Sequence, residues 1–369
     1  MNFQEFNLIP PLHKALEEIG YTKATEIQSN AIPNILKGSD LIGCAQTGTG
    51  KTAAFAIPIL QLLHTNAQPK AAIKALILTP TRELAIQIDD NFKMYGKYMP
   101  IKHLAIFGGV PQGKQVAALK KGVHILIATP GRLLDLLQQK LISLAQLQIL
   151  VLDEADRMLD MGFVNDVKKI LTQVPSKKQT LFFSATMPAS IRKFANTMVR
   201  QPVEINVTPV SSTAKTVKQG VYFINKNEKT RLLGQLLKDT SIPRSLVFTR
   251  TKHGADKLVK QLSKMGIHAA AIHGNKSQNA RQRALSDFRD SRIRVLVATD
   301  VAARGIDIEE LPHVVNYEIP NVPETYVHRI GRTGRAGMSG IAISFCDQEE
   351  KADFINIQKL IGFRMPVLQ

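Results

Sequence analysis

Short apolar runs alternate with longer amphipathic stretches over most of the chain. In the first half these runs lie at 75–80 (ALILTP), 124–130 (HILIATP), 149–156 (ILVLDEAD) and 180–186 (TLFFSAT). Runs of this length separated by helix-like stretches predict strand–helix–strand units on a parallel sheet. Several runs end in polar pairs such as Thr-Pro or Asp-Glu, and strand ends are where open α/β sheets bind their ligands. The pattern therefore predicts an α/β fold with a ligand site at one sheet edge.

The alternation is interrupted once, at 205–218 (INVTPVSSTAKTVK), where Ser, Thr, Pro and Lys gather. This composition indicates an exposed linker, with a long surface loop as the alternative. The alternation then resumes through GVYFIN, SLVFTR, HAAAIHG, RVLVATD, HVVNYEIP and GIAISF. A chain of 369 residues also exceeds the usual size of a single core. We predict two domains, 1–207 and 218–369, joined by a linker at 208–217.

Two strings of the first half have counterparts in the second half. ILTPTR at 77–82 is similar to VFTRTK at 247–252, and IATPGR at 127–132 is similar to VATDVA at 297–302. Similarity at a fixed, long period hints at an internal duplication. The two predicted domains are therefore expected to share one architecture.

The charge of the chain is strongly positive, because 48 Lys and Arg stand against 30 Asp and Glu and give a formal net charge of +18. This excess favours a polyanionic partner, and nucleic acid is the first candidate. A solubility charge spread over the surface is the alternative, and charge alone does not separate the two. The motifs must decide between them.

Cysteine content and hydropathy exclude several classes of protein. The only cysteines, Cys44 and Cys346, lack metal-ligand spacing and are expected to be small buried apolar residues. The N-terminal segment carries acidic residues without a continuous apolar core, and no stretch reaches the roughly eighteen apolar residues of a membrane span. We expect a cytoplasmic protein.

A glycine-rich segment, AQTGTGKT at 45–52, lies between the apolar DLIGC and the helix-forming TAAFAI. A turn of this kind between a strand and a helix is typical of a phosphate-binding P-loop. Gly48 and Gly50 can turn backbone N–H groups toward phosphate oxygens, Lys51 places a cation on the phosphates, and the Thr52 hydroxyl can bind Mg²⁺. The first Gly of the general motif is replaced here by Ala45.

Two acids, Asp153 and Glu154, follow the apolar run ILVL directly. Beside a P-loop, Asp153 can hold Mg²⁺, and Glu154 can orient and deprotonate the water that attacks the phosphoanhydride. A solvated acidic turn is the structural alternative. The pair predicts hydrolysis of a nucleotide without a covalent intermediate.

Three arginines interleaved with glycines, Arg329, Arg332 and Arg335, lie in YVHRIGRTGRAG at 326–337. Arg332 and Arg335 can stabilise the transferring γ-phosphoryl group if the second domain closes on the first. Hydrolysis would then require domain closure.

Taken in order, Gln28, AQTGTGKT, PTRELA, TPGR, DEAD, SAT, ATDVAARGID and HRIGRTGR resemble the motifs of DEAD-box RNA helicases and span nearly the whole chain. The bacterial RhlE-type subgroup is the one the chain resembles most. The resemblance implies two tandem RecA-like domains of helicase superfamily 2, each a mostly parallel sheet with helices on both faces, and ATP with Mg²⁺. Ala24 and Glu26 stand where prolines are common in the family, so a less rigid adenine-reading segment is expected.

The resemblance also assigns the nucleotide contacts. A Gln amide matches the donor and acceptor of adenine together, which favours ATP over GTP at Gln28. The expected contacts to the nucleotide are Phe3, Tyr21, Thr25, Gln28, Ala45, Gln46, Thr47, Gly48, Thr49, Gly50, Lys51, Thr52, Asp153, Gly305, Asp307, Arg332 and Arg335.

A further group is expected to link hydrolysis to RNA. In the family the SAT hydroxyls bond toward the DEAD segment, although without the family SAT is merely a strand end. The expected coupling residues are Asp156, Ser184, Thr186, His328 and Arg329.

The RNA-facing strings are rich in Thr hydroxyls, arginines and helix-start N–H groups, which suit phosphate and sugar oxygens and carry no base information. Stacking aromatics are scarce there, which favours tracking of the backbone. A 2′-hydroxyl both donates and accepts, so it can distinguish RNA from DNA. The expected RNA contacts are Pro80, Thr81, Arg82, Gly108, Gly109, Thr129, Pro130, Gly131, Arg132, Arg250, Thr251, Gly274, Gln278, Arg281 and Thr299.

The sequence thus predicts an RNA-dependent ATPase that separates short RNA duplexes or remodels RNA–protein complexes. An ATP-gated RNA clamp or scaffold with little unwinding uses the same motifs and stays open. A DNA-translocating motor is disfavoured by the DEAD tetrad and Gln28. The family suggests ribosomal or RNA-decay proteins as partners, ribosome assembly as a role and a monomeric core.

Overall fold

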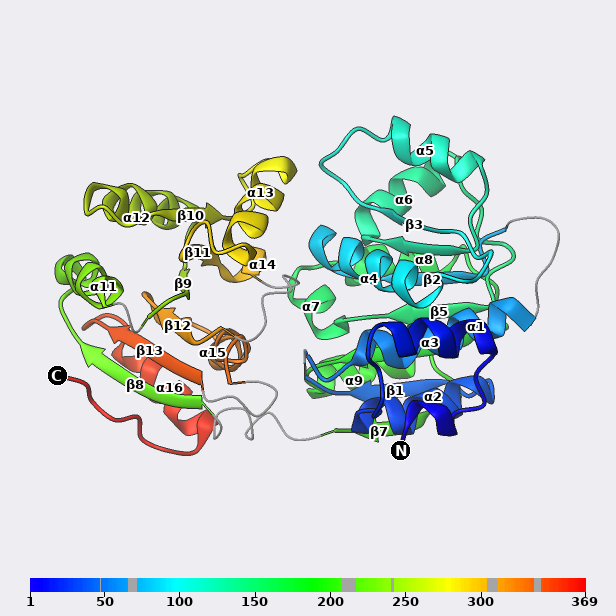
Figure 1. The fold of residues 1–369 in the computed structure, drawn as a ribbon, viewed down its shortest axis with the longest axis horizontal. Helices are drawn as coiled ribbons and strands as arrows, with labels where there is room; N and C mark the ends of the chain where they lie inside the picture. The colour runs from blue at the N-terminus through cyan, green and yellow to red at the C-terminus, as the bar shows by residue number, and fades with distance from the viewer. Residues whose placement is uncertain (47, 66–71, 208–216, 240–241, 304–310, 335–339) are drawn as a thin grey trace. The chain divides into compact units, whose positions relative to one another are not determined.

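The structure is a computed structural model of the 369-residue chain and describes all residues except 47, 66–71, 208–216, 240–241, 304–310 and 335–339. The chain divides into two compact units, Met1–Thr208 and Pro209–Gln369 (Figure 1). Residues 208–216 of the predicted linker lie outside the described residues, and Val217 is the first residue of a strand. Each unit is a complete α/β structure in itself.

The first unit is built on a seven-stranded sheet with the order β3-β4-β2-β5-β6-β1-β7, in which every pairing is parallel. The strands are β1 (Leu41–Cys44), β2 (Ala75–Leu78), β3 (His103–Ile106), β4 (Ile125–Ala128), β5 (Ile149–Leu152), β6 (Gln179–Ser184) and β7 (Val203–Asn206). All carboxyl ends therefore meet at one edge.

Helices cover both faces of this sheet (Figure 1). Neighbouring strand residues point to opposite faces, so Val151 belongs to one apolar cluster and Leu150 and Leu152 to another. The helices are η1 (Phe3–Glu5), α1 (Pro10–Glu18), α2 (Glu26–Leu36), α3 (Lys51–Thr65), α4 (Arg82–Tyr95), α5 (Gly113–Lys120), α6 (Pro130–Gln138), α7 (Ala155–Asp160), α8 (Val164–Leu171) and α9 (Ala189–Asn196).

The second unit has a six-stranded parallel sheet with the order β10-β11-β9-β12-β13-β8. Its strands are β8 (Val217–Phe223), β9 (Ser245–Thr249), β10 (Ala269–Ile272), β11 (Val295–Thr299), β12 (His313–Asn316) and β13 (Gly340–Cys346). Its helices are η2 (Lys226–Glu228), α11 (Lys229–Lys238), α12 (Lys252–Lys264), α13 (Gln278–Arg289), α14 (Asp300–Ala303), α15 (Pro323–Ile330) and α16 (Lys351–Ile361).

The two sheets share one strand order, apart from the additional edge strand β7 of the first unit. Reading both orders from the same edge, β4, β2 and β5 of the first unit correspond to β11, β9 and β12 of the second, and β1 corresponds to β8. The similar strings ILTPTR and VFTRTK lie at β2 and β9, and IATPGR and VATDVA lie at β4 and β11. The expectation of two α/β units with largely parallel sheets is confirmed.

Two strands of the first unit lack a strong signal in the sequence. β3 is half-buried, and β7 lies at the sheet edge and runs into the segment where the apolar alternation breaks down.

Among the described residues, no helix has the length and apolar character needed to cross a membrane.

Candidate functional site

The glycine-rich segment connects β1 to α3, and Lys51 is the first residue of α3. Gly48 and Gly50 have φ angles of 84° and 89°, in the left-handed region that favours glycine. Lys51 is 6% exposed and its Nζ donates to the Ala45 carbonyl oxygen at 2.7 Å. Burial lowers the pKa of Lys51, and the nearby Asp153 carboxylate opposes that shift. Thr47 lies outside the described residues.

The predicted adenine-reading segment packs directly on this loop. Thr25 caps α2, its N–H donates to Gln28 Oε1 at 2.9 Å, and its hydroxyl donates to the Thr49 carbonyl oxygen at 2.8 Å. Gln28 Nε2 donates to the Gly50 carbonyl oxygen at 3.2 Å. A Cβ added at Gly50 would lie 2.3 Å from Gln28 Nε2, so a side chain there would displace the Gln28 amide. Gln28 is thus tied to the P-loop, and reading adenine would require it to exchange one of these bonds.

The aromatic residues that sequence analysis assigned to the nucleotide lie in an apolar cluster. Phe3 is 3% exposed, and its ring centroid lies 5.4 Å from that of Tyr21. The Tyr21 and Tyr95 hydroxyls are 3.1 Å apart. The buried ring of Phe3 therefore packs against the ring of Tyr21, which is itself half-buried.

The acidic pair follows β5 at the carboxyl edge of the sheet. Asp153 is 2% exposed; burial raises its pKa to about 6, although Lys51 lowers it. Its Oδ1 accepts the Glu154 N–H at 3.0 Å. Glu154 adopts the left-handed conformation (φ 53°), unusual for a residue other than glycine. That turn aims the Glu154 carboxylate at the Arg157 guanidinium, with which it forms a buried ion pair.

The DEAD and SAT segments are joined by direct hydrogen bonds. The Asp156 carboxylate accepts both the backbone N–H and the hydroxyl of Thr186, each at 2.9 Å. The Ser184 hydroxyl accepts the Asp156 N–H at 3.3 Å and donates to the Thr186 carbonyl oxygen at 2.7 Å. The carboxyl ends of β5 and β6 are therefore locked together by side chains.

The donor set at this edge fits a magnesium ion carried by a nucleotide. Among the described residues, no group of three His, Cys, Asp or Glu side chains could hold a metal by itself. Asp153 offers a buried carboxylate and Thr52 a hydroxyl, both hard oxygen donors. Mg²⁺ characteristically takes one or two protein oxygens and completes its shell with phosphate and water. The residues therefore suit a shared site, not a dedicated protein cage.

The second unit holds its predicted arginines in different settings. Arg329 is 2% exposed and pairs with Asp300 through Nε–Oδ1 at 2.5 Å and Nη2–Oδ2 at 2.8 Å. It also donates to Asn316 Oδ1 at 3.2 Å. Arg329 thus braces the ends of β11 and β12. Arg332 is buried and His328 half-buried. Gly305, Asp307 and Arg335 lie outside the described residues.

The predicted RNA residues of the first unit gather at the carboxyl ends of β2, β3 and β4. Pro80 and Thr81 follow β2, and the Thr81 hydroxyl caps α4 by accepting the Leu84 N–H at 3.3 Å. Arg82 lies against Gly109, where an added Cβ would be 2.0 Å from its Nη1. Thr129 and Pro130 likewise begin α6. Several helix-start N–H groups thus face the same edge.

Arg132 and the neighbouring glycines complete this edge. Arg132 donates to Gln115 Oε1 at 3.1 Å and to the Val110 carbonyl oxygen at 3.0 Å. A Cβ at Gly108 or Gly131 would meet no atom within 4 Å, so the backbone is open there. Arg132 therefore orders the loop after β3 through its own hydrogen bonds.

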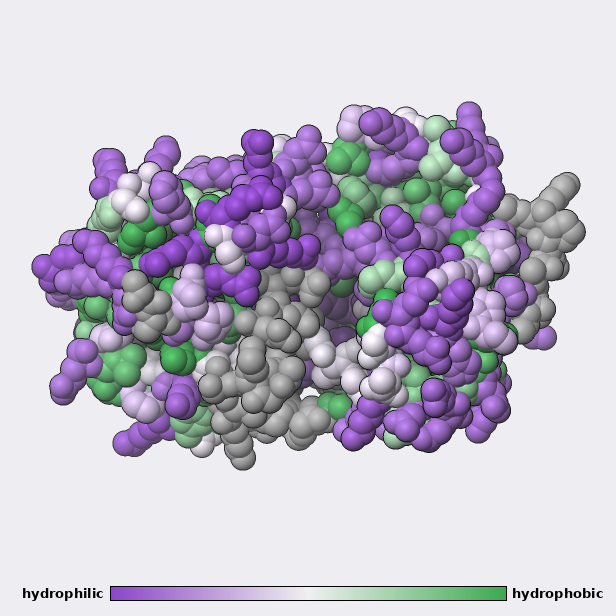
Figure 2. Space-filling view, viewed as in Figure 1, coloured by the Kyte–Doolittle hydropathy of each residue, from purple (hydrophilic) through white to green (hydrophobic). Residues whose placement is uncertain are grey.

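In the second unit, Thr251 repeats the role of Thr81, because its hydroxyl caps α12 by accepting the Gly254 N–H at 3.0 Å. Arg250 donates through Nε to the Ile319 carbonyl oxygen at 2.6 Å and pairs with Glu350 at 3.2 Å. Gly274 is exposed, and Gln278, Arg281 and Thr299 are buried. Hydrophilic side chains gather over α13 (Figure 2). Arg250 is anchored to its own unit instead of projecting freely.

Some residues of the site were missed by sequence reasoning. Arg157, three residues after Glu154, holds that carboxylate, and Asp300 holds Arg329. The i,i+3 spacing of Glu154 and Arg157 was a usable signal on a helix. The Arg329–Asp300 pair spans 29 residues, so only the fold brings it together.

Comparisons with known proteins agree with this geometry. The DEAD/DEAH box helicase family matches residues 25–194, and the helicase conserved C-terminal domain matches residues 228–337. The chain is 44% identical to the DEAD-box ATP-dependent RNA helicase CshA of Bacillus cereus over 363 residues, covering 98% of this chain and 69% of CshA. CshA of Bacillus subtilis is also 44% identical, over 95% of this chain and 71% of CshA.

Solved structures give the same result. Saccharomyces cerevisiae Dbp5 bound to RNA and ADP BeF3 matches with a TM-score of 0.89 and 34% identity, covering 100% of this chain and 95% of Dbp5. A DEAD box protein from Methanococcus jannaschii matches with a TM-score of 0.57 and 39% identity, covering 100% of this chain and 99% of that protein.

Proposed function

We propose that this chain, which belongs to the DEAD-box family of ATP-dependent RNA helicases, separates short RNA duplexes locally and remodels RNA–protein complexes while it hydrolyses ATP. The chain has the two tandem RecA-like domains of that family and is an RNA-stimulated ATPase. The observation that carries the proposal is the hydrogen bonding of Asp156 to Thr186, which ties the ATP edge of the first unit to the SAT segment. Events at the phosphates can therefore be transmitted through this pair.

We propose that four residues of the first unit, Lys51, Thr52, Asp153 and Glu154, carry out hydrolysis. Lys51 binds the β and γ phosphates, and its buried position strengthens that attraction because little water screens the charge. Glu154 orients the attacking water and accepts its proton when Arg157 releases the carboxylate. Mg²⁺, held by Thr52 and Asp153, would neutralise charge on the phosphates when bound. Arg332 and Arg335 are the proposed donors of positive charge from the second unit.

The nucleotide contacts are proposed to follow the sequence prediction. Gln28 recognises adenine by exchanging its Gly50 bond, which would couple occupancy of the base site to the shape of the P-loop. Ala45, Gln46, Gly48, Thr49 and Gly50 supply backbone groups to phosphate. Tyr21 borders the base, with Phe3 supporting its ring. Thr47, Gly305 and Asp307 keep their predicted roles.

RNA is the proposed nucleic acid substrate, as it is in the Dbp5 complex. Thr81, Thr129 and Thr251 stand at helix starts, where a hydroxyl and backbone N–H groups can bind phosphate oxygens. Contacts of this kind read no base, so sequence preference should be weak. Arg250 would mainly hold its own loop in place and contribute less to RNA binding, because its guanidinium already pairs with Glu350 and Asp353.

The finer assignments are proposals of the same kind. They comprise membership of the RhlE-type subgroup, a cytoplasmic location, a monomeric core, and ribosomal or RNA-decay partners. The similarity to CshA weighs against the RhlE-type subgroup. The domain limits are proposed at 1–207 and 218–369. An ATP-gated RNA clamp with little unwinding is the second candidate function.

The test is steady-state ATP hydrolysis without nucleic acid, with single-stranded RNA and with DNA of the same sequence, alongside separation of a short labelled RNA duplex. We expect stimulation by RNA alone and duplex separation that requires ATP. Equal stimulation by DNA would contradict the RNA assignment. Stimulation by RNA without duplex separation would favour the clamp.

A further inference from the structure

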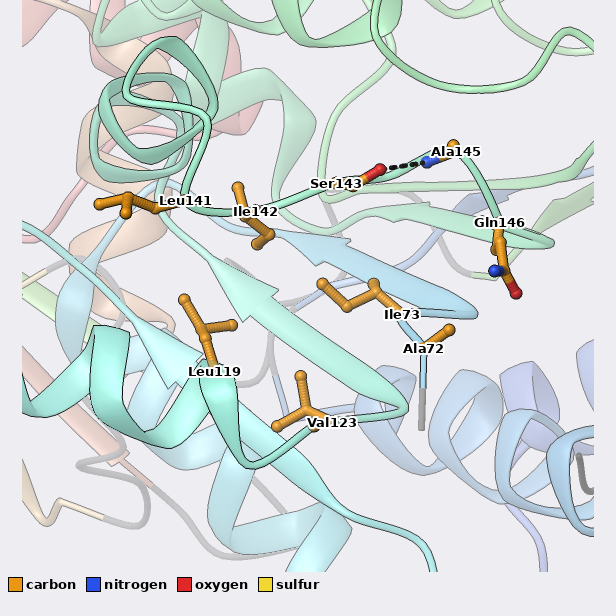
Figure 3. A pocket seen from close by; sticks show the side chains of 10 residues that line it. Ala72, Ile73, Leu119, Val123, Leu141, Ile142, Ser143, Ala145 and Gln146 are labelled. Carbon is orange, nitrogen blue, oxygen red and sulfur yellow. Dashed lines mark hydrogen bonds between the residues drawn. The ribbon is translucent and has the colours of Figure 1, made fainter. Parts of the chain in front are cut away.

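A partly apolar cavity lies in the first unit, away from the predicted nucleotide edge. Its volume is about 270 Å³, and its lining comes from three segments that enter adjacent strands (Figure 3). Ile73 precedes β2, Val123 precedes β4, and Gln146 precedes β5. Because these strands are parallel neighbours, the cavity lies at the amino-end edge of the sheet.

Aliphatic side chains form the apolar part of the lining, and hydrogen bonds hold the backbone there in place. Leu119, Leu141 and Ile142 add apolar surface to the wall, and Leu141 is 36% exposed. The Gly122 N–H donates to the Leu119 carbonyl oxygen at 2.9 Å, and the Leu141 N–H donates to that of Leu136 at 3.0 Å. Such bracing keeps a cavity preformed, which lowers the entropic cost of binding.

The segments around the cavity carry positive charge only. Residues 72–74, 118–124 and 139–148 contain four lysines and no Asp or Glu. Lys74 Nζ donates to Gln146 Oε1, on the cavity wall, at 2.9 Å. Lys120, Lys121 and Lys140 are exposed and adjoin lining residues in the chain. The apolar part of the lining therefore has only cationic charged neighbours in these three segments.

We propose that this cavity is a docking site for a short acidic segment of a partner protein, with one bulky apolar side chain inserted and carboxylates on either side. The volume lies below the roughly 300–1,000 Å³ of pockets that enclose drug-sized ligands, so it suits a single side chain. The flanking lysines select acidic neighbours by charge complementarity. RNA is the poorer occupant, because the lining offers no aromatic ring on which a base could stack.

The position of the cavity has a functional consequence. Lys51, Asp153 and Thr81 all follow carboxyl ends of strands, at the opposite edge of the sheet. A peptide at the amino-end edge leaves those residues of the first unit accessible. The site would therefore tether the helicase to a partner without competing for nucleotide.

The test begins with selection of random short peptides displayed on phage against the whole chain. We expect enrichment of a bulky aliphatic or aromatic residue flanked by Asp and Glu. A fluorescein-labelled copy of the enriched peptide is then titrated by fluorescence anisotropy. Lys120→Glu combined with Lys121→Glu should weaken binding by about tenfold or more. Ser143→Phe, which places a ring at the cavity wall, should do the same without altering charge.

The matched control is Lys168→Glu with Lys169→Glu, an exposed pair on α8 with the same change in net charge and no lining residue. It should keep peptide affinity within about threefold. RNA-stimulated ATPase activity of each variant reports folding. The proposal is overturned by selection without acidic and apolar enrichment, or by peptide affinity that Ser143→Phe leaves unchanged. Loss of affinity for a labelled RNA oligonucleotide in the Lys120/Lys121 variant, with no peptide bound, would assign the surface to RNA and also overturn it.

Discussion

Two lysines at corresponding positions have opposite surroundings in the two units. Lys51 is the first residue of α3, which follows β1, and Lys229 is the first residue of α11, which follows β8. Both are buried. Lys51 donates to a backbone carbonyl at 2.7 Å, whereas Lys229 pairs with Asp347 at 3.0 Å and with Glu350 at 2.5 Å.

This difference shows where two units with similar strand orders differ. A carbonyl partner leaves the charge of Lys51 available for a phosphate, whereas two carboxylates neutralise Lys229 and make it a structural anchor. The helix starts after β2 and β9 have not diverged in the same way, because Thr81 and Thr251 cap α4 and α12 alike. The common feature is thus the predicted RNA edge, whereas the proposed phosphate site lies in the first unit.

The largest expected effect is on the rate of ATP hydrolysis and concerns Glu154, the acid two residues after β5. Glu154→Gln should lower the maximal rate of ATP hydrolysis by about a thousandfold, because the amide cannot accept a proton from water. Binding of ATP and RNA should persist. Rapid-quench measurement of ATP cleavage with saturating RNA checks the rate, and unchanged turnover would remove Glu154 from this role.

Glu318 provides the matched control, since it stands two residues after β12 as Glu154 does after β5. Its Oε2 accepts the Arg250 N–H at 2.6 Å, which is a structural contact. Glu318→Gln should leave the rate at saturating RNA within a few-fold. Equal losses in both variants would contradict the proposed contrast between the two edges.

Replacing the two lysines gives the next largest effects. Lys229 is expected to affect the stability of the second unit, and Lys51 the ATPase activity. Lys229→Met should lower the free energy of unfolding of its unit by about 3–5 kcal/mol, because the buried Asp347 carboxylate loses its cation and Glu350 keeps only Arg250. Lys51→Met should cost little stability but lower ATP hydrolysis by at least about a hundredfold. Urea unfolding followed by circular dichroism, together with ATPase assays, measures both. A large loss of stability in Lys51→Met, together with unchanged stability in Lys229→Met, would contradict this comparison.

Asp153 predicts a pH dependence of stability. Burial raises its pKa from the ordinary 3.8 to about 6, so the folded state holds a proton that the unfolded state releases. Wild-type stability should therefore fall as pH rises from about 4 to about 6, by up to about 3 kcal/mol. Asp153→Asn removes this dependence, so its advantage over wild type should grow across that window and be constant above it. Urea unfolding of the nucleotide-free protein at several pH values measures the difference, and an advantage that shrinks with rising pH would show a lowered pKa.

Much of the fold could be predicted because periodicity and turn chemistry agree along the chain. Buried parallel strands are apolar throughout, so β2, β4 and β5 stand out in the sequence. β3 and β7 do not, because they are partly exposed and so are not apolar throughout. The P-loop and the acids after β5 were predictable for a related reason: their chemistry needs contiguous residues in a fixed order.

The contacts of the site were less predictable, since they depend on packing between distant segments. Sequence analysis assigned Gln28 to adenine and Arg250 to RNA, but the Gly50 and Glu350 contacts of these residues arise only in the fold. The buried network around Lys229 was invisible for the same reason, with Glu350 lying 121 residues away. Local motifs therefore gave candidates for the chemistry, and the fold shows what holds each one.

The smallest expected effect concerns the link between the ends of β5 and β6. Thr186→Val keeps the side-chain shape but removes the hydroxyl that donates to Asp156, while the backbone N–H of residue 186 remains as a donor. Unfolding free energy should fall by only about 1 kcal/mol. ATP hydrolysis should change little. The number of RNA duplexes separated per ATP should drop several-fold, because the ends of β5 and β6 are then less tightly coupled in their motion.

Thr197→Val serves as the control, because it removes the hydroxyl of an exposed residue that donates to the Phe194 carbonyl oxygen on α9. If both variants separate duplexes with wild-type efficiency per ATP, the Asp156–Thr186 bond only stabilises the first unit, and its role in coupling is excluded.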